Sequence, residues 1–239
     1  MLLLAVALIL ADPQRVIALE GDTHHVQGIV VDGPTRLWVT SVDRPTRKGF
    51  LFEYHLPSGK RLRAIEIQDG DRYHPGGLDA TRDSLWIPVA EYRRGSSAVI
   101  QKRNKKTLAL EAQFSVNDHI GCIAVAKDRL YGGNWDSRQI YEWTFDGRQL
   151  AKRDRTSDVS YQDIKYRAQK VIASGLRTNG TGAVDFLDPK TLKIKRSIDF
   201  AKTDRDVRYT HEGMDLRNRL IYFLPEDTPS RLFVYRLPK

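Results

Sequence analysis

The sequence of 239 residues contains a single cysteine, Cys122. This excludes an intrachain disulfide and any zinc site built from several cysteines. Cys122 lies in the apolar segment GCIAV, where we expect a buried and unreactive thiol in a strand. The GxSxG and P-loop motifs are also absent, which argues against a serine nucleophile of that kind and against P-loop nucleotide binding.

The chain is basic overall, with 39 lysine and arginine residues against 30 aspartate and glutamate residues and a net charge of +9. The basic residues are dispersed, and the sequence shows neither a run of five like charges nor a known nucleic-acid-binding motif. We therefore expect no nucleic-acid partner and consider a small anionic ligand instead. The hydrophobic fraction of 41% is ordinary for a soluble globular protein, and a chain of this length can bury a full-sized core.

The first residues, MLLLAVALILA, form an apolar run that ends before Asp12 and Pro13. The run is too short to cross a bilayer as a helix, which takes about 20 residues, so we expect no stable membrane span. Its length is typical of the hydrophobic region of a signal peptide, although no positively charged region precedes it. A buried strand or a misassigned start is the alternative. We predict a secreted or periplasmic protein whose mature part, residues 12–239, is a single domain.

Similar segments recur at intervals of about 40 to 50 residues, a spacing typical of repeat proteins. They read GIVVDGPTRLWVTS from Gly28, GLDATRDSLWIPVA from Gly77, CIAVAKDRLYGGNW from Cys122, DIKYRAQKVIASG from Asp163 and GMDLRNRLIYFLPE from Gly213. Each contains two short apolar segments joined by a polar turn. Two further strands follow in the first four repeats, with Gly, Pro and Asp at turns such as PSGK, FDGR and DPKT.

Four short strands per repeat indicate one blade of a propeller, and helical periodicity is nearly absent. The sequence therefore predicts an all-β fold, a five-bladed β-propeller with four-stranded antiparallel blades. The last repeat has only three strands and ends in RLFVYRL. We expect RVIALEG, near the N-terminus, to supply the fourth strand and close the ring, because closure removes an exposed sheet edge. Trp38 and Trp86 take the same place in their second strands, so we expect both in the core between blades.

A histidine precedes most of the repeats. His25, His74 and His119 stand three residues before the aligned position, His211 is offset by one, and Ser160 takes the place in the fourth repeat. Because the first strand of each blade lines the channel of a propeller, these side chains should gather at the channel mouth. Burying several cations together is costly, which favours neutral imidazoles. The alternative is that each histidine only hydrogen-bonds the backbone of a neighbouring blade.

Neutral imidazoles can also bind a divalent metal in the central channel, where Asp79, Asp163 and Asp215 offer carboxylates to complete a site. No HExxH or other compact metal motif is present, so the sequence assigns no cofactor. We expect little tightly bound zinc in the purified protein, because each imidazole ligand would still need an acid behind it to orient its ring.

The loops between second and third strands should rise on the same face as the histidines. They are polar, and the stretch GGNWDSR combines an aromatic ring with amide, acidic and guanidinium groups, which suits a small polar molecule. The excess of arginine favours a carboxylate or phosphate on that molecule. Together with the four histidines and Asp79, the candidate ligand-binding residues are Glu91, Arg94, Asn134, Trp135, Asp136, Arg138, Arg177 and Glu226.

The opening HVQGIVVDG and the five-unit spacing resemble the secreted bacterial propellers related to plant-type glutaminyl cyclotransferases, and the wider lactonase-like and strictosidine-synthase-like group. The glutamate–glycine–tryptophan signature of the cyclotransferases is not visible. The HxxG repeats and the NWDSR stretch are more similar to an uncharacterised bacterial family of secreted five-bladed propellers. That resemblance implies a fold and no known reaction.

We therefore predict a monomeric, exported propeller that binds a small polar, anionic molecule at a histidine-lined channel mouth. The first alternative is an enzyme that uses the same face, either a metal-assisted hydrolase or lactonase or a cyclotransferase. The second alternative is a purely structural or protein-interaction propeller. It predicts exposed apolar patches, of which the loop sequences show few.

Overall fold

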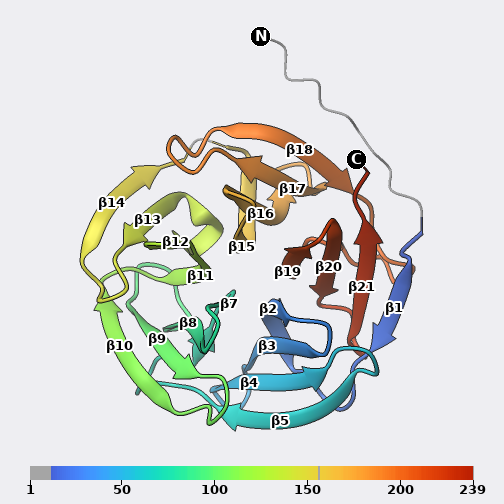
Figure 1. The fold of residues 1–239 in the computed structure, drawn as a ribbon, viewed down its shortest axis with the longest axis horizontal. Helices are drawn as coiled ribbons and strands as arrows, with labels where there is room; N and C mark the ends of the chain where they lie inside the picture. Colours follow the sequence, from blue (N-terminus) through green and yellow to red (C-terminus); the bar gives the residue numbers. More distant parts are fainter. Residues whose placement is uncertain (1–11, 156, 239) are drawn as a thin grey trace.

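The computed structural model describes residues 12–155 and 157–238. Five antiparallel sheets stand around a central axis like the blades of a propeller, as Figure 1 shows. The prediction of a five-bladed β-propeller is confirmed. The apolar run at 1–11, for which we expect a signal segment, lies outside the described residues.

Blades 1 to 3 follow one another along the chain, each with its first strand at the centre and its last strand at the rim (Figure 1). Blade 1 consists of β2 (His25–Asp32), β3 (Arg36–Asp43), β4 (Lys48–His55) and β5 (Lys60–Glu66). Blade 2 has an interrupted inner strand and consists of β6 (His74–Pro75), β7 (Asp79–Ala80), β8 (Ser84–Ala90), β9 (Ala98–Asn104) and β10 (Leu110–Val116). Blade 3 consists of β11 (Ile120–Val125), β12 (Leu130–Asn134), β13 (Gln139–Trp143) and β14 (Gln149–Asp154).

Blades 4 and 5 complete the ring. Blade 4 consists of β15 (Val159–Arg167), β16 (Lys170–Arg177), β17 (Gly182–Leu187) and β18 (Ile194–Phe200). Blade 5 combines β19 (Glu212–Arg217), β20 (Leu220–Pro225) and β21 (Arg231–Arg236) with β1 (Arg15–Ala18) from the other end of the chain. β1 pairs antiparallel with β21, with Arg15 opposite Val234. The N-terminal strand thus closes the ring as predicted and covers the backbone edge that β21 would otherwise expose.

Hydrophobic side chains fill the spaces between neighbouring blades and form five clusters. Trp38 lies in the cluster between blades 1 and 2, and Trp86 lies in the cluster between blades 2 and 3, as predicted. Cys122 is fully buried between blades 3 and 4, where burial raises the pKa of its thiol to about 11. The buried, unreactive thiol expected from the sequence is therefore what the fold produces.

The inner strands approach one another closely at glycine positions. A Cβ atom on Gly28 would lie 2.4 Å from the Cα atom of Gly77, so no side chain fits there. The backbone N–H of Gly77 donates to the carbonyl of Gly121, and the N–H of Ile123 donates to the carbonyl of Gly77, both at 2.9 Å. Blades 2 and 3 therefore share backbone hydrogen bonds next to the axis, and the channel is narrow.

Buried ion pairs close the channel below the histidines. Lys165 and Asp163 pair with both side chains fully buried, and Asp163 also accepts backbone hydrogen bonds from blades 1 and 5. Arg167 bridges Asp79 at 2.8 Å and Asp215 at 2.9 Å. The structure places these last two aspartates at the far end of the channel. A strand rises about 3.3 Å per residue, so a residue four or five positions after the histidine lies near the opposite face.

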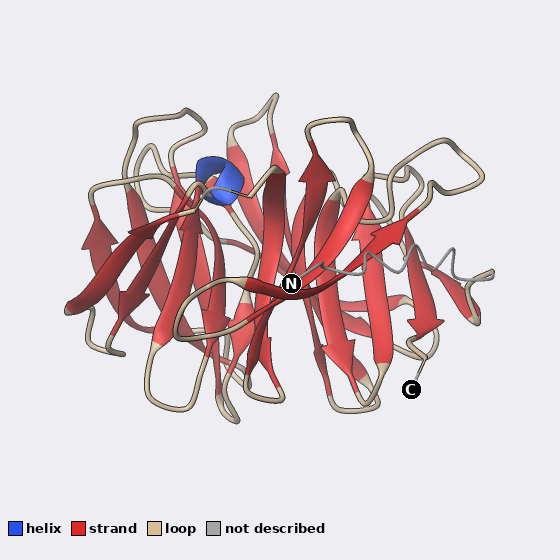
Figure 2. Cartoon of the chain, turned by 90° about the horizontal axis from the view of Figure 1, so that it is seen from above, coloured by secondary structure: helices blue, strands red, loops and turns tan. Residues whose placement is uncertain are grey.

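Seen edge-on, the ring has loops on both faces (Figure 2). The helical turn η1 (Trp135–Ser137) lies on one of these faces, between β12 and β13. Within residues 12–155 and 157–238, no helix has the length and apolar character that crossing a membrane requires.

Candidate functional site

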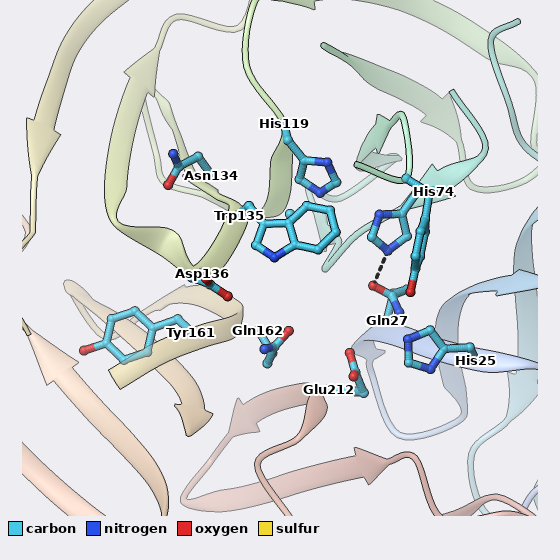
Figure 3. A pocket seen from close by; sticks show the side chains of 12 residues that line it. His25, Gln27, His74, His119, Asn134, Trp135, Asp136, Tyr161, Gln162 and Glu212 are labelled. Carbon is cyan, nitrogen blue, oxygen red and sulfur yellow. Dashed lines mark hydrogen bonds between the residues drawn. The ribbon is translucent and has the colours of Figure 1, made fainter. Parts of the chain in front are cut away.

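A pocket of about 140 Å³ lies at the mouth of the channel, on the face that carries η1. Figure 3 shows how the labelled side chains surround this space from several directions. The lining residues are His25, Gln27, His74, Tyr92, His119, Gly121, Asn134, Trp135, Asp136, Tyr161, Gln162 and Glu212. All five blades contribute, so the site exists only in the closed ring.

Two of the histidines lie next to each other, with ring centroids 5.2 Å apart. Nδ1 of His119 donates to the carbonyl of Glu91 at 2.9 Å, which leaves a lone pair on Nε2. Nε2 of His74 donates to the side-chain oxygen of Gln27 at 2.7 Å. Burial lowers the pKa of His119 to about 4, and burial together with the neighbouring imidazoles lowers the pKa of His74 well below its usual value. Both rings are therefore neutral at pH 7.

The NWDSR stretch makes a sharp turn at η1. The side-chain oxygen of Asn134 accepts a backbone hydrogen bond at 2.8 Å across the turn, and Asp136 adopts a left-handed φ of 60°. This turn brings Trp135 against His119, with ring centroids 4.5 Å apart. The guanidinium of Arg94 lies 5.0 Å from the Trp135 ring centroid and pairs with Asp136 at 2.6 Å. The aromatic side of the pocket is therefore held in place by a local turn and an ion pair.

His25 lies at the edge of the pocket among charged groups. Its Nδ1 is 2.8 Å from Oε1 of Glu226, and its Nε2 contacts the guanidinium of Arg44. The contact with His25 and the nearby guanidinium hold the pKa of Glu226 below its usual value, so this carboxylate is charged at pH 7. Arg44 lies 5.2 Å from the ring centroid of Tyr92, and it forms an ion pair with none of the described carboxylates.

In blade 5 the pocket is lined by Glu212 instead of His211. The His211 side chain is 37% exposed and does not line the pocket, whereas Glu212 is 4% exposed and does. Burial, and repulsion by Glu226, raise the pKa of the Glu212 carboxyl well above its usual value. The nearest basic atom, Nε2 of His211, lies 3.4 Å from Oε1 of Glu212. No donor in the described part of the chain forms a hydrogen bond with this carboxyl group.

Other polar groups in the pocket also have no partner among residues 12–155 and 157–238. They are the hydroxyl of Tyr92, the indole N–H of Trp135 and the side-chain amide of Gln162. These three side chains are half-buried, whereas Nδ1 of His74 is buried and has no hydrogen-bond partner in the described chain. Buried polar atoms normally find a partner, either in the protein or in a bound molecule. The pocket therefore offers both donors and acceptors to a ligand.

The structure brings most of the predicted site residues to this pocket. Those that line it are His25, His74, His119, Asn134, Trp135 and Asp136. Three others contact a lining residue: Glu226 contacts His25, Arg94 pairs with Asp136, and the Glu91 carbonyl accepts from His119. The remaining four lie elsewhere. His211 is outside the pocket, and Asp79 binds Arg167 at the far end of the channel. Arg138 donates to Ser157 and Ser160, and Arg177 pairs with Asp199.

Sequence reasoning missed six lining residues: Gln27, Tyr92, Gly121, Tyr161, Gln162 and Glu212. Gln27 and Gln162 each stand two residues after the repeated histidine position, and the two-residue period of a strand was a signal that could have found them. Glu212 was missed because β19 lacks a β-bulge that other inner strands have. The inner strands of blades 1, 3 and 4 carry a bulge before the aligned position and β19 does not. Loss of one residue reverses which of two successive side chains faces the channel.

Comparison with known proteins identifies a family. Residues 14–177 match the model of DUF6454, a family of unknown function. The chain belongs to this family. No curated protein matches, and a specific similarity to cyclotransferase or lactonase-like propellers stays a prediction.

Two solved structures are similar to this chain. The WD40 domain of Neurospora crassa Pan2 has a TM-score of 0.50 and 14% identity, over 90% of this chain and 64% of that one. The computationally designed Ika4 protein has a TM-score of 0.45 and 16% identity, over 72% of this chain and 98% of that one. The likeness to the WD40 domain, at this identity, supports the propeller fold and carries no functional information.

Proposed function

We propose that this protein binds a small polar molecule with one anionic group in the pocket at the channel mouth. The observation that carries the proposal is the convergence of unsatisfied polar groups on one cavity. Tyr92, Trp135 and Gln162 offer donors there, and the neutral ring of His119 offers an acceptor at Nε2. Nδ1 of His74, which also lines the pocket, is buried without a hydrogen-bond partner in the described chain, and a purely structural pocket would leave this unfavourable arrangement unrelieved.

The size of the pocket limits the enclosed part of the ligand. A cavity of about 140 Å³ is close to the volume that encloses one benzene ring. The rings of Trp135 and Tyr92 provide flat apolar surfaces against which one face of a small ring or chain can pack. We therefore expect a ligand about the size of a six-membered ring with polar substituents, and larger ligands must extend out of the mouth.

The anionic group is expected next to Arg44. Most of the loop arginines are neutralised by acids: Arg93 pairs with Glu91, Arg94 with Asp136 and Arg177 with Asp199. Arg44 does not line the pocket itself, but it contacts the lining side chains of His25 and Tyr92. A guanidinium that has no carboxylate partner in the described chain can accept a ligand carboxylate in a two-pronged contact.

A ligand screen tests the proposal. We would measure the thermal stabilisation of the protein by small carboxylates, each compared with its primary amide. Gln162→Ala should then weaken binding of a hit about tenfold, the effect of one lost hydrogen bond. Arg44→Gln should weaken carboxylate binding about tenfold to a hundredfold and remove the preference for the carboxylate over the amide.

Arg138→Ala is the matched control, because Arg138 lies on the same face but donates to Ser157 and Ser160 outside the pocket. It should leave affinity unchanged. A carboxylate whose affinity is the same in wild type, Gln162→Ala and Arg44→Gln would contradict the proposed site.

Separate activity assays test the predicted catalytic alternatives. Resemblance to lactonase-like and glutaminyl cyclotransferase propellers implies lactone hydrolysis and cyclisation of an N-terminal glutamine, and each reaction is detected as product formation. Export also stays a prediction. N-terminal sequencing of protein recovered from the periplasm or the medium should begin near Asp12.

A further inference from the structure

Three side chains from distant parts of the sequence meet at one edge of the pocket. They are His25 at the start of β2, Glu212 at the start of β19, and Glu226 in the loop between β20 and β21. One potential ligand atom from each lies within 4.8 Å of the other two. Figure 3 shows the Glu212 carboxyl facing the His25 ring. We propose that these three residues bind one divalent metal ion, a function that goes beyond binding of the small molecule.

The first supporting observation is the environment of Glu212. Its side chain is 5% exposed, and its carboxyl group lies close to that of Glu226. Within residues 12–155 and 157–238, no lysine or arginine forms an ion pair with Glu212 and no donor forms a hydrogen bond with it. A buried carboxyl group in this position requires either a proton or a cation, and the second carboxylate close by favours a cation that both can share.

The second supporting observation is the position of His25 Nδ1. This atom is buried and has no hydrogen bond of good geometry, although it lies 2.8 Å from Oε1 of Glu226. The proton on Nδ1 is therefore not directed at the carboxylate. Two ligand atoms that bind one metal at about 2.1 Å and at right angles lie about 3 Å apart. The observed separation is close to that value, so the pair is already spaced as two ligands of one ion.

Arg44 must move when the metal binds. A guanidinium can only donate, so its contact with Nε2 of His25 requires a lone pair on that nitrogen. Coordination through Nδ1 leaves the proton on Nε2, which can then no longer accept from Arg44. The metal replaces the positive charge of the guanidinium beside Glu226, and Arg44 becomes free to bind the anionic group of the small molecule. The two ligands should therefore assist each other's binding.

The donor set indicates the class of metal. One imidazole nitrogen with two carboxylate oxygens suits first-row divalent ions such as Mn²⁺ and Zn²⁺ better than Ca²⁺, which prefers oxygen ligands alone. The site differs from the ring of imidazoles considered from the sequence. His74 and His119 use one nitrogen each for Gln27 and Glu91, and neither belongs to the cluster.

The test is a titration with Mn²⁺ alone, using the full-length protein after treatment with a chelator. Loss of the free Mn²⁺ signal in electron paramagnetic resonance measures binding without any organic ligand. Wild type should bind one Mn²⁺ per chain. Glu212→Gln and Glu226→Gln should bind at least tenfold more weakly, while Glu66→Gln, which changes a carboxylate on the outer strand β5, should bind as wild type does.

Melting curves establish that each variant is folded, and the half-exposed Glu226 provides the test if Glu212→Gln does not fold. Arg44→Gln should bind Mn²⁺ at least as tightly as wild type, because a competing cation is removed. Absence of saturable Mn²⁺ binding in wild type, unchanged binding in both Glu→Gln variants, or weaker binding in Arg44→Gln would each overturn the metal site.

Experiments can reject the metal site and the proposed small-molecule site independently of each other. Trp135→Ala should lose the organic ligand and keep Mn²⁺ binding, because Trp135 lies on the His119 side of the pocket and is not in the cluster. A carboxylate that binds in the presence of chelator, with wild type unable to bind Mn²⁺, would retain the small-molecule site and reject the metal.

Discussion

Deletion of residues 1–20 removes β1 and should destabilise the whole propeller, whereas deletion of residues 1–11 leaves β1 intact. Ile17 and Leu19, each 6% exposed, belong to the hydrophobic cluster between blades 5 and 1. Burial of one such side chain contributes about 1.5–3 kcal/mol, so the longer deletion should cost about 3–6 kcal/mol. It also uncovers the backbone edge of β21, where residues 231–234 pair with β1.

A loss of this size is a large part of the total stability, which is about 5–15 kcal/mol for a native protein. For a domain of this length, each kcal/mol shifts the melting temperature by about 2–4 °C, so the two truncated proteins should differ by about 10–20 °C. Calorimetry on both proteins gives the measurement. Within the shorter truncation, Ile17→Ala should lower the melting temperature, and Val16→Ala, at a 45% exposed position of the same strand, should have little effect. Equal melting temperatures for the two truncations would refute the role of β1 in closing the ring.

Two further substitutions and one labelling experiment test other parts of the molecule. Arg167→Met leaves Asp79 and Asp215 buried without their cation, so urea denaturation should show a loss of about 3–5 kcal/mol, with Mn²⁺ binding unchanged. His119→Gln should weaken binding of the small molecule about tenfold. Because the imidazole protonates near pH 6.5 when unfolded and near pH 4 when folded, wild type should lose up to about 3 kcal/mol relative to this variant as pH falls from 6.5 to 4, and nothing above pH 7. Cys122, with a pKa of about 11, should react with thiol reagents at pH 7.5 only after unfolding; rapid labelling of the native protein would show that the blade 3–4 interface opens.

The architecture could be predicted because it depends on patterns within single repeats. Alternating apolar strands and turns with Gly, Pro and Asp occur within each repeat of about 40 to 50 residues, and the count of such repeats gives the number of blades. Closure followed from the three-stranded last repeat and the spare strand RVIALEG, since an open edge is unfavourable. The places of Trp38 and Trp86 followed from the same alignment.

The composition of the site could be predicted only in part. Repetition of one position around a ring implies proximity, and it brought His25, His74 and His119 together correctly. The prediction that Asp79 belongs to the site at the channel mouth was wrong. Asp79 stands five residues after His74, and a strand of that length reaches from the mouth to the far end of the channel. The excess of arginine led to the prediction that Arg94 and Arg177 are free to bind an anionic ligand. The guanidinium groups of Arg94 and Arg177 are paired with acids that the sequence does not identify as their partners.

The sequence by itself determined the number of blades, their strand order, the closure of the ring and the side of the channel on which the histidines gather, because these depend on local periodicity and on repetition. Only the tertiary structure decided that Glu212 replaces His211 in the pocket and that it meets His25 and Glu226. That arrangement depends on a single missing bulge in β19 and on contact between residues about 200 positions apart. A bulge reverses the direction of a side chain without changing the apolar pattern, so the residues that form the site become visible only when the blades are assembled.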